Sequence, residues 1–420
     1  MTEQAKVPAI RFAGFTDPWE QRKFGDCFEF LKSNTLSRAG LNGENGTARN
    51  VHYGDILIKF GDCLDDERSD LPFITDDTVL PKYAGSILRE GDVIFADTAE
   101  DETAGKCVEL RKLPKEPTIS GLHTIPARPR FPFGTGYLGH YLNSDAYHRQ
   151  LLPLMQGIKV ISVSKAALQD TQVRFPGLSE QSAIGAALNE IDSLITLHQR
   201  KYDKLVIFKK SMLEKMFPKD GESVPEIRFA GFTDPWEQRE LVDIAEIVGG
   251  GTPDTNNSNY WDGDIDWYAP AELGNNIYAE SSTRKITQAG FDSCSTKMLP
   301  ADKTILFTSR AGIGNTAILR HSACTNQGFQ SLVIGDADVY FVYSMSERIK
   351  KWAEEKASGS TFLEISGRQL ETMPVNLPSL VEQQAIGSFF SHLDDLITLH
   401  QRKLELLQNI KKSLLDKMFV

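Results

Sequence analysis

The chain has 420 residues, of which 40% are hydrophobic and 25% are charged, a composition typical of a globular protein with two or three domains. This composition excludes a collagen-like or fully disordered chain, and no apolar run is long enough to span a bilayer. The formal net charge of −11 argues mildly against nucleic acid as a partner. Because the N-terminus lacks a secretion signal and the five cysteines lack metal-binding spacing, we expect a cytoplasmic protein with free thiols, no bound metal and no membrane partner.

Two kinds of segment occur twice in the chain. Residues 7–23 and 224–240 differ at two of 17 positions, and both contain the motif IRFAGFTDPWEQR. Residues 178–217 and 380–419 are identical at 23 of 40 positions, including LITLHQRK in both copies. Repeats of this size indicate a tandem duplication in which one chain contains two related halves.

Each half encloses an insert, and the two inserts have diverged in sequence. In a duplicated chain the parts that hold the halves together must stay alike, whereas parts that face different ligands can change. The repeat therefore predicts an α+β protein with a pseudo-two-fold axis, in which two globular domains are separated by two long helices. The predicted boundaries are 1–177 for the first domain, 178–217 for the first helix, 218–379 for the second domain and 380–420 for the second helix.

The two long segments carry a heptad pattern. Apolar side chains recur alternately three and four residues apart, and residues 186–217 and 388–420 contain no proline or glycine. Each segment should form a helix of roughly 35 residues, about 50 Å long. The two helices could pack on each other as a coiled coil, which the pseudo-two-fold axis would make antiparallel. Lys209 and Lys411 would then be among the polar positions that set its register. The alternative is that each helix packs on its own domain. The predicted seam contains Ile184, Leu188, Ile191, Ile195, His198, Leu205, Ile386, Phe390, Leu393, Ile397, His400 and Leu404.

The short repeated motif is rich in aromatic side chains. Trp19 and Trp236 are its matching tryptophans, and each follows two phenylalanines. We expect each motif to be a compact anchor that packs on an insert or on the far end of a helix.

The inserts combine short β-like runs with turns, without the regular alternation of a parallel α/β fold. Strands are predicted within residues 54–64, 91–98, 304–310 and 331–336, and short helices at residues 144–155 and 346–356. Neither insert is basic, because residues 24–177 have a net charge of −4 and residues 241–379 have a net charge of −6. A nucleic-acid-binding face would therefore have to be a local patch.

Several insert loops supply arginine, asparagine and glutamine, whose side chains are suited to bidentate contacts with guanine or adenine. For any one of these residues, a solvated loop side chain is the simpler alternative. The candidate DNA contacts are Lys106, His123, Arg128 and Arg130 in the first insert, and Arg284, Lys285, Arg310, Asn315, Asn326 and Gln327 in the second.

Sequence patterns of catalysis are missing. No Walker loop, GxSxG, HExxH or methyltransferase tetrapeptide occurs, and the FGTGYLG run at residues 133–139 is too weak to indicate a nucleotide site. We therefore predict a binding and organising protein with no catalytic residues and no cofactor of its own. An enzyme that acts alone is the less favoured alternative.

The layout closely resembles the specificity subunit of type I restriction–modification enzymes. The resemblance covers essentially the whole chain and rests on the duplicated motif, on GGTPxTxxxxYWxGxIxW at residues 250–267, on LPxxxTILFTSRAxIG at residues 299–314 and on the paired helical segments. The first insert lacks the GGTP and SRAxIG elements and resembles a different subtype of target recognition domain.

The resemblance implies a non-catalytic subunit that reads double-stranded DNA. Each insert would read half of a bipartite site, and the antiparallel helices would set the distance between the half-sites. Two modification subunits and the restriction subunits would be the protein partners, and S-adenosylmethionine, ATP and Mg would bind to them. A protein–protein scaffold built on the coiled coil, with no role in DNA binding, remains the alternative.

Overall fold

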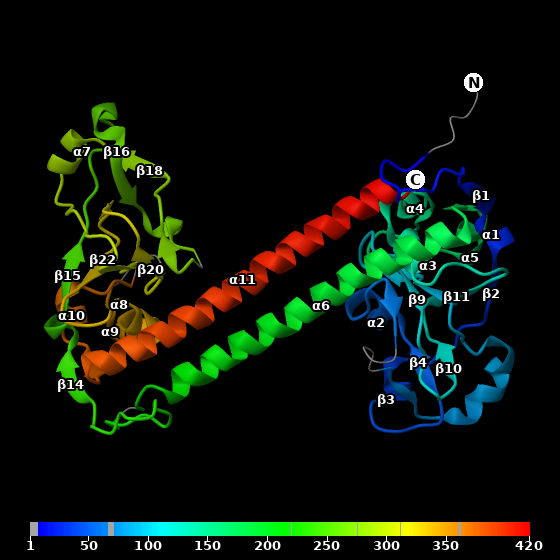
Figure 1. The fold of residues 1–420 in the computed structure, drawn as a ribbon, viewed down its shortest axis with the longest axis horizontal. Coiled ribbons are helices and arrows are strands. Elements are labelled where there is room, and N and C mark those ends of the chain that lie inside the picture. The colour runs from blue at the N-terminus through cyan, green and yellow to red at the C-terminus, as the bar shows by residue number, and fades with distance from the viewer. Residues whose placement is uncertain (1–6, 66–70, 220, 275, 311, 360–362) are drawn as a thin grey trace. The chain divides into compact units, whose positions relative to one another are not determined.

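The computed structural model describes residues 7–65, 71–219, 221–274, 276–310, 312–359 and 363–420 (Figure 1). The chain divides into two compact units. The first contains residues 1–200 and 401–420, and the second contains residues 201–400. Each unit therefore includes the beginning of one long helix and the end of the other. Within the described part of the chain, no helix is long and apolar enough to cross a membrane.

The first unit is built on short antiparallel and parallel strand pairs. Its five-stranded sheet has the order β2 (Phe28–Phe30), β11 (Thr124–Pro129), β7 (Val93–Ala96), β9 (Cys107–Leu110) and β5 (Cys63–Leu64). Its four-stranded sheet has the order β10 (Thr118–Ser120), β4 (Arg49–Val51), β6 (Phe73–Ile74) and β3 (Leu41–Asn42). Two small sheets pair β1 (Glu20–Lys23) with β13 (Gln172–Phe175), and β12 (Ile161–Ser162) with β8 (Thr98–Ala99).

Helices of the first unit pack on these sheets (Figure 1). They are α1 (Phe24–Cys27), α2 (Tyr53–Ile58), α3 (Tyr137–Asn143), α4 (Asp145–His148), α5 (Lys165–Asp170) and the long α6 (Leu178–Lys215), which continues into the second unit. Three-residue 3-10 turns lie at Arg38–Gly40 and Leu152–Leu154, and a longer one spans Asp77–Ser86.

The second unit has a five-stranded and a three-stranded sheet. The first has the order β15 (Ala245–Gly249), β22 (Gln330–Ile334), β19 (Thr304–Phe307), β20 (Thr316–Leu319) and β17 (Tyr278–Ala279). The second has the order β18 (Arg284–Ile286), β16 (Trp261–Tyr268) and β21 (Cys324–Thr325), and β14 (Glu237–Glu240) pairs with β23 (Pro374–Leu377). Its helices are α7 (Gln288–Asp292), α8 (Val339–Ser344), α9 (Ser346–Lys356), α10 (Gly367–Glu371) and the long α11 (Leu380–Met418), with 3-10 turns at Leu241–Asp243, Ser258–Tyr260 and Pro270–Glu272.

Most local predictions for the inserts are confirmed. Strands occur within residues 91–98, 304–310 and 331–336, and α9 has the predicted bounds. The helix predicted at residues 144–155 is only partly correct, because α4 ends at His148 and a 3-10 turn containing Pro153 follows. Proline lacks the N–H that a continuing α-helix would need.

The strand predicted across residues 54–64 is wrong for most of its length. The Nδ1 atom of His52 accepts a hydrogen bond from the backbone N–H of Gly54 at 3.2 Å and so caps a helical turn, α2. At the other end, the Lys106 ammonium donates to the carbonyls of Leu57 and Phe60 at 3.1 and 3.0 Å. The alternating apolar residues fit a strand, but the cap from the preceding residue His52 and the contacts of the distant Lys106 favour the helix, and only β5 is extended.

The tryptophan of each short motif packs against the last turn of a long helix. In the first unit Trp19 lies edge-on to Phe419, with ring centroids 6.5 Å apart. In the second unit Trp236 meets Phe217 in the same way at 5.8 Å. Both phenylalanines are buried in the core of the unit where their helix ends. The prediction that the motif anchors the far end of a helix is confirmed.

A second contact of the motif holds the beginning of the other helix. Arg11 donates two hydrogen bonds to Glu180 of α6, at 2.8 and 2.5 Å, and Arg228 does the same with Glu382 of α11, at 2.8 and 2.7 Å. These carboxylates are almost fully buried, so the arginine neutralises a charge that water cannot reach. The motif is therefore a clamp that joins the start of one helix to the end of the other.

The two predicted long helices are confirmed. α6 has 38 residues and α11 has 39, and all twelve predicted seam residues are buried or half-buried. In each unit the start of one helix lies beside the end of the other, so the two run antiparallel.

Buried lysine–aspartate pairs tie the helices together. In the second unit the Lys209 ammonium on α6 lies 2.6 Å from Asp394 of α11. In the first unit Lys411 of α11 lies 2.6 Å from Asp192 of α6. Both pairs occupy matching positions of the repeat, so each unit has the same helix register.

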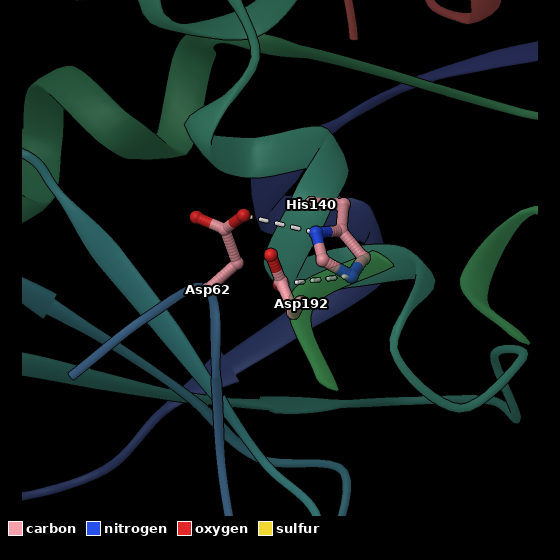
Figure 2. A group of neighbouring side chains, drawn as sticks. All are labelled: Asp62, His140 and Asp192. Atoms are coloured by element: carbon pink, nitrogen blue, oxygen red, sulfur yellow. Dashed lines mark hydrogen bonds and ion pairs between the residues drawn. The ribbon is translucent and has the colours of Figure 1, made fainter. Parts of the chain in front are cut away.

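The first unit adds two insert side chains to its pair. Asp62 lies 2.7 Å from the Lys411 ammonium, and the Nδ1 atom of the fully buried His140 is 2.9 Å from Asp62 (Figure 2). Asp62, His140 and Asp192 present ligand atoms within 4.8 Å of one another, a spacing that could hold a metal ion. Because Lys411 contacts both carboxylates, its ammonium supplies the positive charge of this cluster.

We expect Arg228→Ala to destabilise the second unit by about 3 kcal/mol, because it leaves the buried Glu382 carboxylate without a partner. Arg239→Ala, which removes an exposed pair with Glu237, should have little effect on the free energy of unfolding, because water screens the pair. Chemical denaturation followed by tryptophan fluorescence measures both. Equal effects for the two variants would contradict a clamping role for Arg228.

The cluster also predicts a pH dependence. Burial opposes the ionisation of Asp62, but the hydrogen bond with His140 and the charge of Lys411 outweigh burial and hold the pKa of Asp62 well below its usual range. The stabilisation is therefore present above about pH 4, the pKa of an unfolded aspartate, and is lost as the pH falls toward the native pKa.

Asp62→Asn should remove this dependence. Below about pH 4 the slope of the unfolding free energy against pH should become shallower by up to about 1.4 kcal/mol per pH unit, since one proton no longer binds on unfolding. Asp170→Asn, at an exposed carboxylate, should keep the steep slope. Urea denaturation at a series of pH values measures the slope, and equal slopes for wild type and Asp62→Asn would exclude the linkage.

Candidate nucleic-acid interface

Two of the four candidates in the first insert are bound within the fold. Arg128, near the end of β11, makes bidentate hydrogen bonds to Asp92 at 2.9 and 2.7 Å and a third to the carbonyl of Ile87. The hydrogen bonds with Asp92 raise the pKa of Arg128 despite its partial burial. Lys106 is the second, because its ammonium caps α2 and burial lowers its pKa.

The other two candidates of this insert are exposed. Arg130 directly follows β11, and its backbone N–H donates to the carbonyl of Cys27 at 2.8 Å. His123 has a positive φ of 53° in the turn before β11. Its Nδ1 atom lies 3.3 Å from Asp97, and its ring meets Tyr53 edge-on at 5.3 Å.

Arg130 belongs to a basic cavity of about 500 Å³ in the first unit. Arg128 lines the same cavity together with Arg89 and Arg111, two arginines that the sequence analysis did not select. The Nε atom of Arg111 is buried and has no hydrogen-bond partner among the described residues. Arg89 and Arg111 are far from Arg128 and Arg130 in the sequence, so no single motif could have grouped all four. Their clustering gives the acidic insert a local site that could contact an anionic group.

In the second insert, three candidates converge on one loop. A Cβ atom on Gly328 would lie 3.5 Å from the Nε of Arg310 and 3.0 Å from the Oδ1 of Asn326, so both side chains lie close to this glycine. Asn326 Oδ1 accepts the backbone N–H of Gly328 at 2.7 Å, which holds the amide in place. Gln327, between them in sequence, is exposed.

The GGTP loop lies against the same residues. A Cβ on Gly250 would approach the carbonyl oxygen of Asn326 to 2.1 Å, so only glycine permits this contact. Thr252 then donates its hydroxyl to the side-chain oxygen of Gln327. Thr252 was not selected from the sequence, although the GGTP run that contains it was noted. The loop thus adds a hydroxyl group to the amide and guanidinium groups of the candidates.

Asn315 has an exposed side chain at the end of a tight turn. Its backbone N–H donates to the Thr308 hydroxyl at 2.9 Å, and its carbonyl accepts the N–H of Thr308 at 3.0 Å. The turn encloses Gly312 and Gly314, which both have positive φ, and Ala311 lies outside the described residues. The turn presents the Asn315 amide to solvent beside β20.

Arg284 and Lys285 lie on β18, in the three-stranded sheet. The Arg284 guanidinium stacks 3.7 Å from the ring centre of Trp261 and 5.6 Å from that of Trp267. Lys285 pairs with Asp266 at 3.4 Å. Both side chains have partners within their own sheet, and strand β21 of this sheet leads directly into the loop of Asn326 and Gln327.

Residues 233–409 match the family model of the type I restriction modification DNA specificity domain. This stretch covers most of the second insert, including the loops at Gly250, Arg310 and Asn326, and the greater part of α11. The match supports the motif resemblance in the half of the chain where the motifs are most complete.

Two relatives from Methanocaldococcus jannaschii align with the chain. One is the specificity subunit of the type I restriction enzyme MjaIX, 36% identical over 191 residues, an alignment that spans 44% of each chain. The other is the putative specificity subunit of the type I restriction enzyme MjaX, 23% identical over 414 residues, or 95% of this chain and 92% of the relative. The second alignment thus includes both halves of the repeat.

The fold is also similar to a solved structure, the S subunit of the type I restriction–modification system from M. genitalium. The two share a TM-score of 0.59 over 99% of both chains with 16% sequence identity, which is a likeness of fold. Together with the family match, the full-length relative and the repeated helix–insert layout, this likeness leads to one conclusion. Over nearly its whole length, the chain is similar to specificity subunits of type I restriction–modification enzymes.

Proposed function

We propose that this chain is the DNA-reading, non-catalytic subunit of a type I restriction–modification complex and recognises a bipartite sequence. The observation that carries the proposal is a repeated frame that holds two unlike inserts. The two clamps, the two tryptophan anchors and the two lysine–aspartate pairs recur in both units, whereas the inserts differ in strand order and in surface chemistry. A frame of this kind presents two different readers in equivalent settings.

The reader in the second unit is the loop cluster of Arg310, Asn326 and Gln327. Guanidinium and amide groups can each make two hydrogen bonds with a base edge, and their packing around Gly328 limits their freedom before DNA binds. In the first unit Arg130 and His123 are the exposed candidates. Arg128 and Lys106 act indirectly, because their internal hydrogen bonds keep β11 and α2 in place.

The acidic chain does not supply most of the contacts to phosphate. With a net charge of −11 it repels the DNA backbone, and contacts with phosphates usually contribute much of the affinity. The modification subunits are the complementary source of positive charge. Two moderate readers on one chain also reinforce each other, because the second contact becomes intramolecular.

Two modification subunits would dock on the long helices. Leu197 of α6 and Leu399 of α11 occupy matching repeat positions, and both are nearly half exposed, at 46% and 45%. α11 also exposes Leu396, Leu406 and Ile410 on the same side of its helix. Two equivalent exposed leucines fit two copies of one partner. S-adenosylmethionine, ATP and Mg would bind to the modification and restriction subunits, and the complex would act in the cytoplasm.

A methylation map of DNA tests the function. Co-expression with the modification subunit should give adenine methylation at one interrupted motif, read at base resolution. Gln327→Ala should reduce methylation by about tenfold and relax the sequence preference at only one half-site, since a bidentate base contact contributes about 1–3 kcal/mol of discrimination. Arg130→Ala should affect the sequence preference at only the other half-site. Lys297→Ala, at an exposed surface pair, is the control. A stable complex that methylates no interrupted motif would contradict the proposal.

Docking on the helices has its own test. Leu399→Glu should lower the number of bound modification subunits from two to one, because a charge would enter an apolar interface. The double variant Leu197→Glu with Leu399→Glu should bind no modification subunit. Light scattering of the purified complex measures the mass. Gln401→Glu, at an exposed position on the other side of α11 from Leu399, should keep both copies. Full occupancy in the double variant would place the docking site elsewhere.

A further inference from the structure

The polar contacts at the helix seam extend into both inserts. In the first unit the Lys411 ammonium joins Asp192 of α6 to Asp62, which lies in the insert. His140 of α3 and Asn143 at the end of α3 also contact Asp62, at 2.9 Å each, and the Nε2 atom of His140 lies 3.1 Å from Asn189 of α6. One network therefore contains side chains from both helices and from the recognition domain, and Figure 2 shows three of its members, Asp62, His140 and Asp192.

In the second unit the same connection uses different chemistry. Asp394 of α11 accepts the Lys209 ammonium on one oxygen at 2.6 Å and the Tyr340 hydroxyl on the other at 2.8 Å. Asp394 is only 6% exposed. Burial and the nearby Asp394 charge raise the pKa of Tyr340 well above its usual range, so the hydroxyl keeps its proton and remains a donor. Two unlike inserts thus reach the same helix aspartate position with different residues.

Apolar packing by itself does not determine this register. A heptad seam tolerates a slide of seven residues, which is about 10 Å along the helix. A base pair rises about 3.4 Å, so such a slide would correspond to about three base pairs of DNA. The lysine–aspartate contacts span less than 3 Å and would be broken by a slide of a single helical turn.

We propose that Lys209 and Lys411 are positioning residues that fix each recognition domain to one register of the helix pair and so restrict the complex to one half-site spacing. The inference rests on the proposed function. Each lysine comes from the helix that ends in the unit, its aspartate partner comes from the helix that begins there, and the insert completes the network. The recognition domain therefore responds to the position of both helices.

The second unit allows a clean test, because its network can be replaced completely. The triple variant Lys209→Met, Asp394→Leu and Tyr340→Phe exchanges the buried polar groups for apolar ones of similar size, a change that is often neutral for stability. Tyr343→Phe, on the same helix and without a hydrogen bond to Asp394, is the matched control, and Lys209→Arg retains the charge.

The variants are co-expressed with the modification subunit and supplied with targets whose half-sites stand up to about three base pairs nearer or farther than in the natural motif. For the triple variant we expect methylation at altered spacings, relative to the natural one, to rise about tenfold. The half-site sequences should stay unchanged and the melting temperature should stay close to that of the wild type. Tyr343→Phe and Lys209→Arg should keep the strict spacing.

The possible failures are distinguishable. If the wild type methylates one interrupted motif and the triple variant keeps the same strict spacing, the positioning role is wrong while the proposed function stands. The same conclusion follows if the triple variant only melts at a lower temperature, because the network would then contribute stability alone. If the wild type methylates no interrupted motif at any spacing, the proposed function fails and the inference fails with it.

Discussion

Two partly buried lysine–aspartate pairs favour one orientation of the helices of this protein. In the antiparallel arrangement Lys209 meets Asp394 and Lys411 meets Asp192. A parallel arrangement of the same repeat would put the two lysines side by side and the two aspartates side by side. Burying like charges together is strongly unfavourable, so the charges select the antiparallel orientation that apolar seam residues alone would not distinguish.

The remainder of the frame follows from that orientation. Because the helices run in opposite directions, the end of each lies beside the start of the other, and a single short motif can hold both. Arg11 and Arg228 neutralise the buried glutamates where the helices begin, while Trp19 and Trp236 cover the phenylalanines where they end. The clamp therefore depends on helix orientation and leaves the inserts free to differ.

The surroundings of the candidate DNA contacts depend on the tertiary structure more than the frame does. Arginine and lysine in an insert loop are equally suited to binding DNA and to capping a neighbouring element. Arg128 binds Asp92 and Lys106 caps α2, partners that lie far away in the sequence. Conversely, Arg89, Arg111 and Thr252 become site residues only because the fold brings them beside Arg130 and Gln327.

The sequence by itself determined the duplication, the two long helices and their apolar periodicity, because these features depend on periodicity and on direct repetition along the chain. Only the tertiary structure decided the conformation of residues 54–64, the partners of the charged insert side chains and the link from Lys411 to Asp62. Each of these depends on groups that are distant in the chain and meet in a buried environment. There, one capping or neutralising contact outweighs the local preference of the segment.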